Sequence, residues 1–160
     1  MQGAVLVLGL GNRLLGDDAA GPLAIDMLTR FADRDAARMD HVNLQDGGTI
    51  GIGLLPAIED ASGLIAIDAA RLGASPGTVR VFEGEAMDRI IAGRKSTAHE
   101  VALADLVAAA ALQGTLPQRR ALVAVEPQSV SVAANPSAVV AAAIPEMCDA
   151  VRRVLHRWTA

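Results

Sequence analysis

Three carboxylates come after apolar runs of the sequence, one of them directly and two after a turn, and carboxylates at such positions can take part in chemistry. Asp17 and Asp18 follow the glycine-containing turn after the apolar run at 4–8, and Asp68 closes the apolar run at 63–67. A carboxylate can bind a divalent cation or act as a general base. A simpler structural role is also open, because aspartates cap helices, complement the helix dipole and form turns. We interpret Asp17 as a helix cap or a support for a site, and keep both interpretations for Asp18 and Asp68.

One histidine could complete a metal site with these carboxylates. His99 lies two residues after Thr97, the expected N-cap of a helix over 97–112. The positive end of the helix dipole disfavours a protonated ring, so a neutral, metal-binding imidazole is expected there. Two carboxylates and one imidazole suit a divalent transition metal of borderline softness. Taken alone, His99 is better explained as a surface histidine, and His41 and His156 are interpreted as structural or exposed.

A dinucleotide site is a weaker hypothesis for the first turn. Gly9 and Gly11 match the first and third positions of a G-x-G-x-x-G fingerprint, but the sixth position is Leu14 and Gly16 comes two residues late. The two adjacent aspartates that follow would also repel a pyrophosphate. A lysine-bearing phosphate loop is absent from the sequence. We therefore expect no organic cofactor.

Serine and cysteine hydrolases fit the sequence poorly. No G-x-S-x-G motif occurs. The single cysteine, Cys148, falls on the apolar stripe of a predicted helix, where a core position is expected.

The order of predicted elements is typical of a layered α/β sheet. Apolar or alternating runs predict strands at 4–8, 41–44, 63–67, 78–82 and 120–125. Helical spacing predicts helices at 22–31, 52–58, 97–112 and 137–158. The third of these has a capping box, Thr97 and Glu100, and stops at Gly114.

Acidic residues recur where the predicted strands end. They are Asp17, Asp18, Asp46, Asp68 and Glu126. Because open α/β sheets bind ligands outside the carboxyl ends of their strands, the functional site is expected at this edge.

Composition excludes several classes of protein. The 160 residues are expected to form a single domain, 1–160, and the 52% hydrophobic content argues against disorder. A net charge of −4, only three aromatic residues and the lack of a basic run make nucleic acid and anionic membranes poor partners. No apolar stretch reaches the roughly 18 residues of a membrane span. With one cysteine and no recognisable signal peptide, a cytoplasmic protein is expected.

The motifs resemble those of a known enzyme family. The segment G-L-G-N-R-L-L-G-D-D-A-A-G-P at 9–22 closely resembles the opening motif of the hydrogenase maturation endopeptidases. The resemblance continues through D-G-G-T at 46–49, L-I-A-I-D-A at 64–69, P-G-T-V at 76–79, H-E-V-A-L-A-D-L-V at 99–107 and V-A-V-E-P at 123–127. It covers nearly the whole chain. Ala19-Ala20 departs from the pattern, because many relatives carry a glycine after the second acid.

The resemblance implies a fold and a site. The family fold is a three-layer αβα sandwich with a twisted, mostly parallel sheet. The positions that contact metal, and that we expect to be catalytic, are Asp18, Asp68 and His99, the first of which is a glutamate in some members. In this comparison Asp46 helps to shape the cleft wall.

The resemblance also implies an activity. The family removes the C-terminal tail of the large-subunit precursor of [NiFe] hydrogenases after nickel insertion, and its members are often classed as aspartic-type peptidases. Nickel would then be supplied by that client, and water would be activated either by the metal or by an aspartate. The alternative is a non-catalytic nickel-sensing chaperone of the same fold. The oligomeric state, the particular client and the cleavage site are not indicated.

Overall fold

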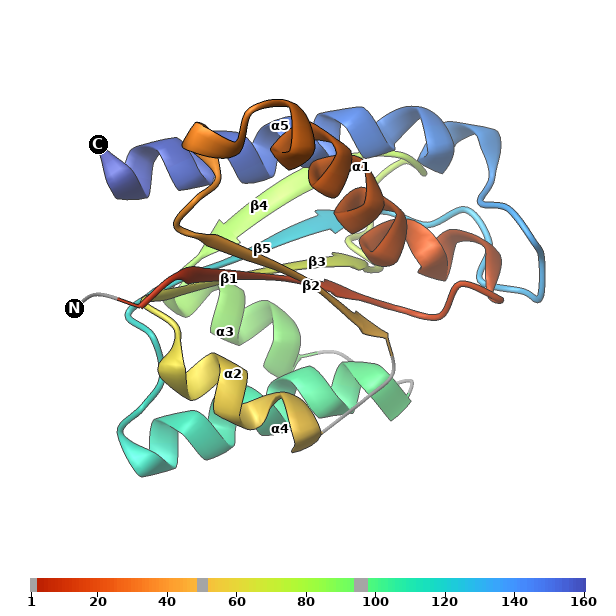
Figure 1. Ribbon diagram of the computed structural model, residues 1–160. Coiled ribbons are helices and arrows are strands. Elements are labelled where there is room, and N and C mark those ends of the chain that lie inside the picture. Colours follow the sequence, from red (N-terminus) through yellow and green to blue (C-terminus); the bar gives the residue numbers. More distant parts are fainter. Residues whose placement is uncertain (1–2, 49–51, 94–97) are drawn as a thin grey trace.

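Five strands form one sheet that is covered by helices on both faces, which confirms the predicted three-layer arrangement (Figure 1). The computed structural model describes residues 3–48, 52–93 and 98–160, except for the side chains of residues 52 and 98–102. The strands are β1 (Val5–Leu10), β2 (Val42–Gly48), β3 (Gly63–Ala69), β4 (Val79–Glu83) and β5 (Arg119–Val125). Their order is β2-β1-β3-β5-β4, with β4 antiparallel to β5 and the other pairs parallel.

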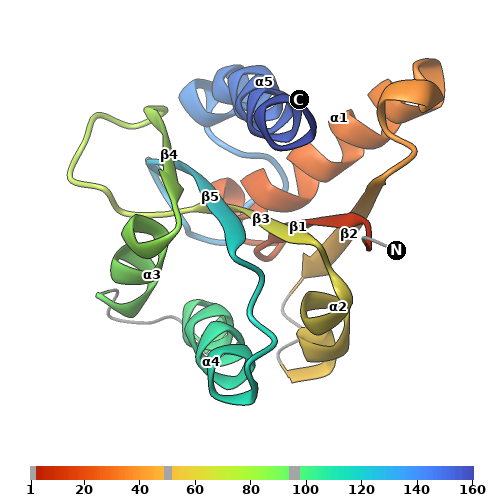
Figure 2. The ribbon, with the colours of Figure 1, turned by 90° about the vertical axis from the view of Figure 1, so that its left-hand side faces the viewer.

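The helices divide between the two faces of the sheet. Figure 2 shows α1 (Ala20–Arg34) and α5 (Ala138–Thr159) on one face, with α2 (Leu55–Asp60), α3 (Glu85–Ala92) and α4 (Ala98–Gln113) on the other. Short 3-10 turns precede or follow these helices at Gly16–Ala19 (η1), Ala36–Arg38 (η2) and Ile52–Leu54 (η3). In the described part of the chain, no helix combines the length and the hydropathy that crossing a membrane requires.

The central strands are buried on both faces, as their continuous apolar runs predict. In β1, Val5 and Val7 belong to the core under α1 and α5, whereas Leu6, Leu8 and Leu10 belong to the core under α2, α3 and α4. Because successive side chains point to opposite faces, one strand contributes to both cores.

Two glycines let α1 rest directly on the ends of the central strands. A Cβ atom on Gly21 would lie 2.3 Å from the Leu10 carbonyl oxygen and 2.5 Å from the Ile67 carbonyl oxygen. A Cβ atom on Gly9 would lie 2.5 Å from Ile25 Cγ1. Side chains at these positions would push the helix away, so the glycines fix the start of α1 at the carboxyl ends of β1 and β3.

The last helix has the predicted apolar seam. Ile144, Cys148, Val151 and Leu155 are buried, and Trp158 packs partly buried against the same core. The Cys148 thiol lies 3.5 Å from the Ala24 carbonyl oxygen, to which it donates, and burial raises the pKa of the thiol to about 11. This confirms the core assignment of Cys148 and argues against a thiolate nucleophile.

Some boundaries differ from the sequence prediction, and one helix was missed. The helix predicted at 52–58 is the η3 turn followed by α2, which has Pro56 in its first turn. The missed helix, α3, has only eight residues and is held to β5 by paired hydrogen bonds of 2.9 and 2.6 Å between the Arg120 guanidinium and the Asp88 carboxylate. The predicted stop of α4 is confirmed, with Gly114 at φ +72°, but its capping box lies outside the described residues and side chains.

Candidate active site

Asp18 and Asp68 lie buried at the carboxyl ends of neighbouring strands. Only 7% of Asp18 and 1% of Asp68 is exposed. Asp68 is the second-last residue of β3. Asp18 is in η1, and η1 contacts β3. Since β1 pairs directly with β3, the structure brings both carboxylates to the edge where the sequence predicts a site.

The backbone after β1 folds closely around Asp18. The Asn12 amide donates a 2.8 Å hydrogen bond to Asp18 Oδ2, and Asn12 Oδ1 accepts one of 2.9 Å from the Leu14 amide. Gly11 has φ +131°, and a Cβ atom there would lie 1.8 Å from the Asp18 carbonyl oxygen. Only glycine fits this position, so the turn that resembles a phosphate loop is shaped to hold a carboxylate.

The third predicted site residue stays untested. His99 is the second residue of α4, and its side chain is outside the part that the structure describes. The described side chains contain no group of three His, Cys, Asp or Glu residues able to hold a metal ion. Of the three predicted ligands, only Asp18 and Asp68 have side chains that the structure describes, so a metal site of Asp18, Asp68 and His99 remains a prediction. Two carboxylates and one imidazole would form a donor set that fits nickel or another divalent transition metal.

Asp17 does not cap the helix that follows it, so that part of the prediction is wrong. Its side chain is fully buried and makes no cap hydrogen bond to η1 or α1. Asp17 Oδ2 accepts hydrogen bonds from the Gln128 and Ser129 amides at 2.7 and 2.9 Å, and Oδ1 accepts one from the Ser137 amide at 2.6 Å. The Ser137 hydroxyl adds a fourth at 2.9 Å to Oδ2.

These contacts also set the charge state of Asp17. Burial by itself acts to raise the pKa of this carboxyl, but the hydrogen bonds from Ser129, Ser137 and Gln128 outweigh it and hold the pKa below its ordinary value. The same hydrogen bonds that lower this pKa join the chain before α1 to the N-cap of α5.

The segment between β5 and α5 is held beside the site by this carboxylate. The backbone adds hydrogen bonds from Ala133 to the Leu14 carbonyl at 3.1 Å and from Asp17 to the Ser129 carbonyl at 3.1 Å. Apolar side chains stay exposed there: Leu14 is 70% exposed and Val132 is 84% exposed. Sequence reasoning did not single out this segment, because Q-S-V-S-V-A-A-N has neither helical nor clear strand character.

Arg13 ties the same turn to the neighbouring strand and helix. Its guanidinium contacts Asp26 Oδ2 at 2.7 Å and Asp46 Oδ2 at 2.9 Å, while Asp46 Oδ1 accepts a 2.9 Å hydrogen bond from the Gly48 amide. The hydrogen bonds to Asp26 and then Asp46 raise the pKa of Arg13, and the bond from Arg13 lowers the pKa of Asp26. Asp46 thus stiffens this edge of the sheet. Arg13 was missed, because nothing in the sequence indicates which acids it meets.

Glu126, the last of the edge carboxylates, supports a loop. It is 7% exposed, and its Oε2 and Oε1 accept hydrogen bonds from the Leu72 and Ala74 amides at 2.9 and 3.2 Å. Asp17, Asp46 and Glu126 are therefore all occupied in fixing the chain around the edge. Asp18, which accepts the hydrogen bond from the Asn12 amide, and Asp68 are the two buried carboxylates for which the sequence predicts a catalytic role; carboxylates can hold a cation or accept a proton from water.

Comparison with known proteins places the fold and the motifs in one family. Residues 25–154 match the family model described as hydrogenase maturation protease, a range that includes Asp68 and His99 and starts after Asp18. The chain is 30% identical, over 155 residues, to the hydrogenase expression/formation protein HupD of Rhizobium leguminosarum bv. viciae, which covers 96% of this chain and 75% of that protein. It is 33% identical over 127 residues to the hydrogenase 2 maturation protease of Escherichia coli (strain K12), covering 79% and 74%.

The solved structures agree with this grouping. The hydrogenase maturating endopeptidase HybD from E. coli superposes with a TM-score of 0.86 at 29% identity, covering 96% of this chain and 93% of that one. The chain spans only 54 to 59% of the length of four other curated relatives.

Proposed function

We propose a specific peptidase activity for this chain, which belongs to the hydrogenase maturation protease family. It removes the C-terminal extension of the large-subunit precursor of a [NiFe] hydrogenase after nickel has been inserted. The observation that supports this most is the pair of buried carboxylates, Asp18 and Asp68, at the carboxyl ends of adjacent strands. A cytoplasmic site of action belongs to the same proposal.

In this proposal nickel is part of the substrate. The metal that the client already holds is bound by Asp18, Asp68 and His99. The free energy with which the protease binds its client therefore depends on whether nickel has been inserted. A donor set without a thiolate is a modest ligand for nickel, whereas the client's cysteine thiolates hold it more firmly. The protease can therefore distinguish a loaded client from an empty one without keeping a metal of its own.

Hydrolysis needs a water that loses a proton and a leaving amine that gains one. Two routes are open. In an aspartic-type route, a carboxylate of Asp18 or Asp68 lies within hydrogen-bonding reach of the scissile peptide and accepts the proton of the water. In a metal-assisted route, the client's metal lowers the pKa of the water. In both routes a carboxylate that has taken the proton from the water can transfer it to the leaving amine, so the two side chains must be held in a fixed geometry. The backbone wrapped around Asp18 and the Asp17 contacts with the β5–α5 segment support that requirement.

The experiment offers the enzyme a large-subunit precursor with and without nickel and measures its mass before and after. We expect loss of the C-terminal extension from the loaded precursor only, and unchanged activity after the enzyme is stripped with a chelator and exchanged into metal-free buffer. Comparable cleavage of the empty precursor would refute the nickel dependence. Tight binding of the loaded precursor without any cleavage would instead identify the non-catalytic, nickel-sensing chaperone.

A further inference from the structure

A basic trough lies at the end of the molecule opposite the paired aspartates. It begins with a hollow of about 920 Å³ between the C-terminal ends of α1 and α5 and the connection into β2. The helix α5 starts near Asp17 and runs 22 residues to Thr159, so the two ends are separated by roughly 30 Å at 1.5 Å per residue. The trough is therefore distinct from the candidate active site.

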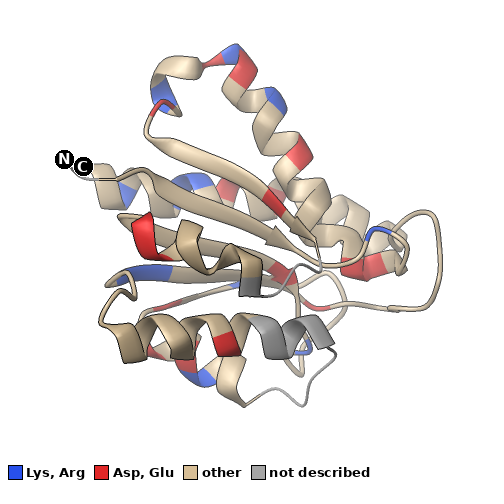
Figure 3. Ribbon diagram, turned by 60° about the horizontal axis from the view of Figure 1, so that its bottom comes forward, with Lys and Arg blue, Asp and Glu red and all other residues tan. Residues whose placement is uncertain are grey.

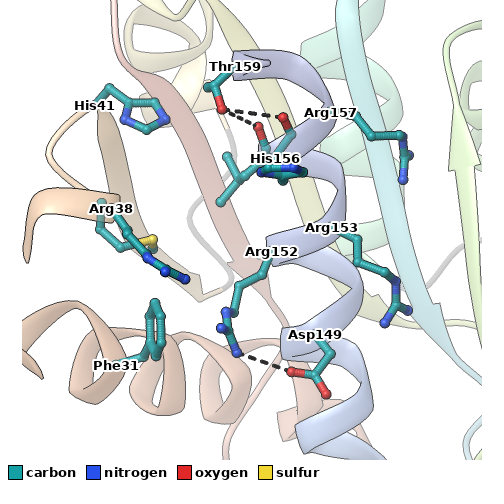
Figure 4. A pocket seen from close by; sticks show the side chains of 11 residues that line it. Phe31, Arg38, His41, Asp149, Arg152, Arg153, His156, Arg157 and Thr159 are labelled. Carbon is teal, nitrogen blue, oxygen red and sulfur yellow. Dashed lines mark hydrogen bonds and ion pairs between the residues drawn. The ribbon is translucent and has the colours of Figure 1, made fainter. Parts of the chain in front are cut away.

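The hollow has an apolar floor and a rim of arginine and histidine side chains. Phe31, Met39 and Leu155 supply the apolar surface. Figure 4 shows Arg38 and His41 on one side and Arg152 and His156, from α5, on the other. The Arg152 guanidinium lies 4.0 Å from the centroid of the Phe31 ring, which holds this cation over the floor.

A second hollow of about 340 Å³ extends the trough along the seam between α1 and α5. It shares Phe31, Asp149 and Arg152 with the first and adds Arg30 and Arg34. Figure 3 shows basic segments recurring along α1 and the turn after it, interleaved with acidic ones. Together the hollows are lined by six arginines and one carboxylate: Arg30, Arg34, Arg38, Arg152, Arg153, Arg157 and Asp149.

The local charge is opposite to that of the chain, whose net charge is −4. Three of these arginines have acidic neighbours: Arg152 meets Asp149 at 3.3 Å, Arg38 meets Asp35 at 3.1 Å, and Arg157 meets Glu83 at 2.9 Å. All three pairs are solvent-exposed and hence weak, so their guanidinium groups can exchange one carboxylate for another.

We infer that the trough binds an acidic polypeptide segment, with carboxylates on the arginines and an apolar side chain over Phe31. Guanidinium groups favour carboxylates through paired hydrogen bonds, and the apolar floor calls for an apolar group between the acids. Two adjoining hollows suit an extended chain better than a compact anion. The large exposed hydrophobic residues of the described chain all lie elsewhere, which disfavours a membrane surface, because no apolar side chain protrudes there to enter lipid.

Fluorescence anisotropy with a labelled probe peptide tests this inference without any hydrogenase precursor present. The probe is a 12-residue peptide in which Glu and Asp flank a central Phe, and the matched peptide carries Gln and Asn instead. We expect the acidic probe to bind at least ~10-fold more tightly than the neutral one, with affinity falling as salt rises. Equal affinity for the two peptides, or no binding of the acidic one, overturns the inference.

Two double variants of equal charge locate the binding. Arg34→Glu/Arg38→Glu changes two exposed side chains of the trough and leaves the Arg152–Phe31 contact intact, whereas Arg80→Glu/Arg89→Glu changes two exposed arginines elsewhere. Circular dichroism verifies that each is folded. We expect only the first to lose affinity, by about 10-fold or more. Equal losses in both variants, or tighter binding to phosphatidylserine-containing vesicles than to the peptide, contradict a peptide site in the trough.

Discussion

Asp17 and Ser137 are joined by two hydrogen bonds, from the Ser137 amide to Oδ1 at 2.6 Å and from its hydroxyl to Oδ2 at 2.9 Å. The contact connects the turn after the first strand with the start of the last helix, 120 residues away. A carboxylate that resembles a helix cap in the sequence is thus a long-range tether beside Asp18.

The first prediction concerns this tether. Asp17→Asn places an amide where the Ser137 amide now donates, so we expect a loss of about 2 to 4 kcal/mol in the free energy of unfolding, beyond the ~1 kcal/mol of a lost helix cap. Urea denaturation measures it. Asp33→Asn, an exposed change on α1, is the control and should stay within ~0.5 kcal/mol. A loss no larger than that of a cap would contradict the tether.

A second prediction concerns the close approach of α1 to the sheet. Gly21→Ala introduces a Cβ atom 2.3 Å from the Leu10 carbonyl oxygen, and we expect a destabilisation of roughly 1 to 3 kcal/mol with reduced activity as η1 shifts. Gly93→Ala is the matched control, because its Cβ atom would meet nothing closer than the Arg89 carbonyl oxygen at 3.2 Å. Similar melting temperatures for the two variants would show that the contact can relax at little cost.

The buried cysteine yields a third prediction. Cys148→Ser should retain activity and lower stability by about 1 kcal/mol, because a more polar group enters the core at the α1–α5 seam. The native thiol should resist iodoacetamide at pH 8, since burial raises its pKa to about 11. Labelling followed by mass spectrometry measures this. Loss of peptidase activity in a folded Cys148→Ser protein would revive a thiol nucleophile.

Arg13 and Asp26 give a prediction for pH. Because the hydrogen bond from Arg13 depresses the pKa of folded Asp26, their pairing contributes stability above the unfolded pKa near 4, and this contribution is lost as the pH falls through the folded value. Arg13→Gln should therefore raise the pKa of Asp26 and flatten the pH dependence of stability below about pH 4. Carboxyl-carbon NMR titration of Asp26 measures the shift. An unchanged pKa in Arg13→Gln would show that the pair does not persist in solution.

Strands and long helices could be predicted because their signals are local. The apolar runs of β1 and β3 and the seam of α5 depend on spacing that the sequence displays directly. The short helix α3 was missed because it depends on tertiary contacts such as the Arg120–Asp88 pair.

The positions of the candidate site residues divide in the same way, while their catalytic role stays a prediction. Asp18 and Asp68 could be predicted because each follows its own apolar run. The partners of Asp17 are 111 to 120 residues away, and no spacing rule identifies them. The basic trough could not be predicted from the sequence either, because its arginines come from three separate segments that only the fold brings together.

The most direct test of the central claim compares carboxylate variants on the nickel-loaded large-subunit precursor. Asp18→Asn and Asp68→Asn remove one charge each at the edge of the sheet, and Asp105→Asn removes one from an exposed position on α4. With all three variants verified as folded, the mass of the precursor is followed over time. We expect cleavage to fall by more than ~100-fold in the first two and to stay near the wild-type rate in the third. Wild-type rates in Asp18→Asn and Asp68→Asn would contradict the assignment of this pair as the active site.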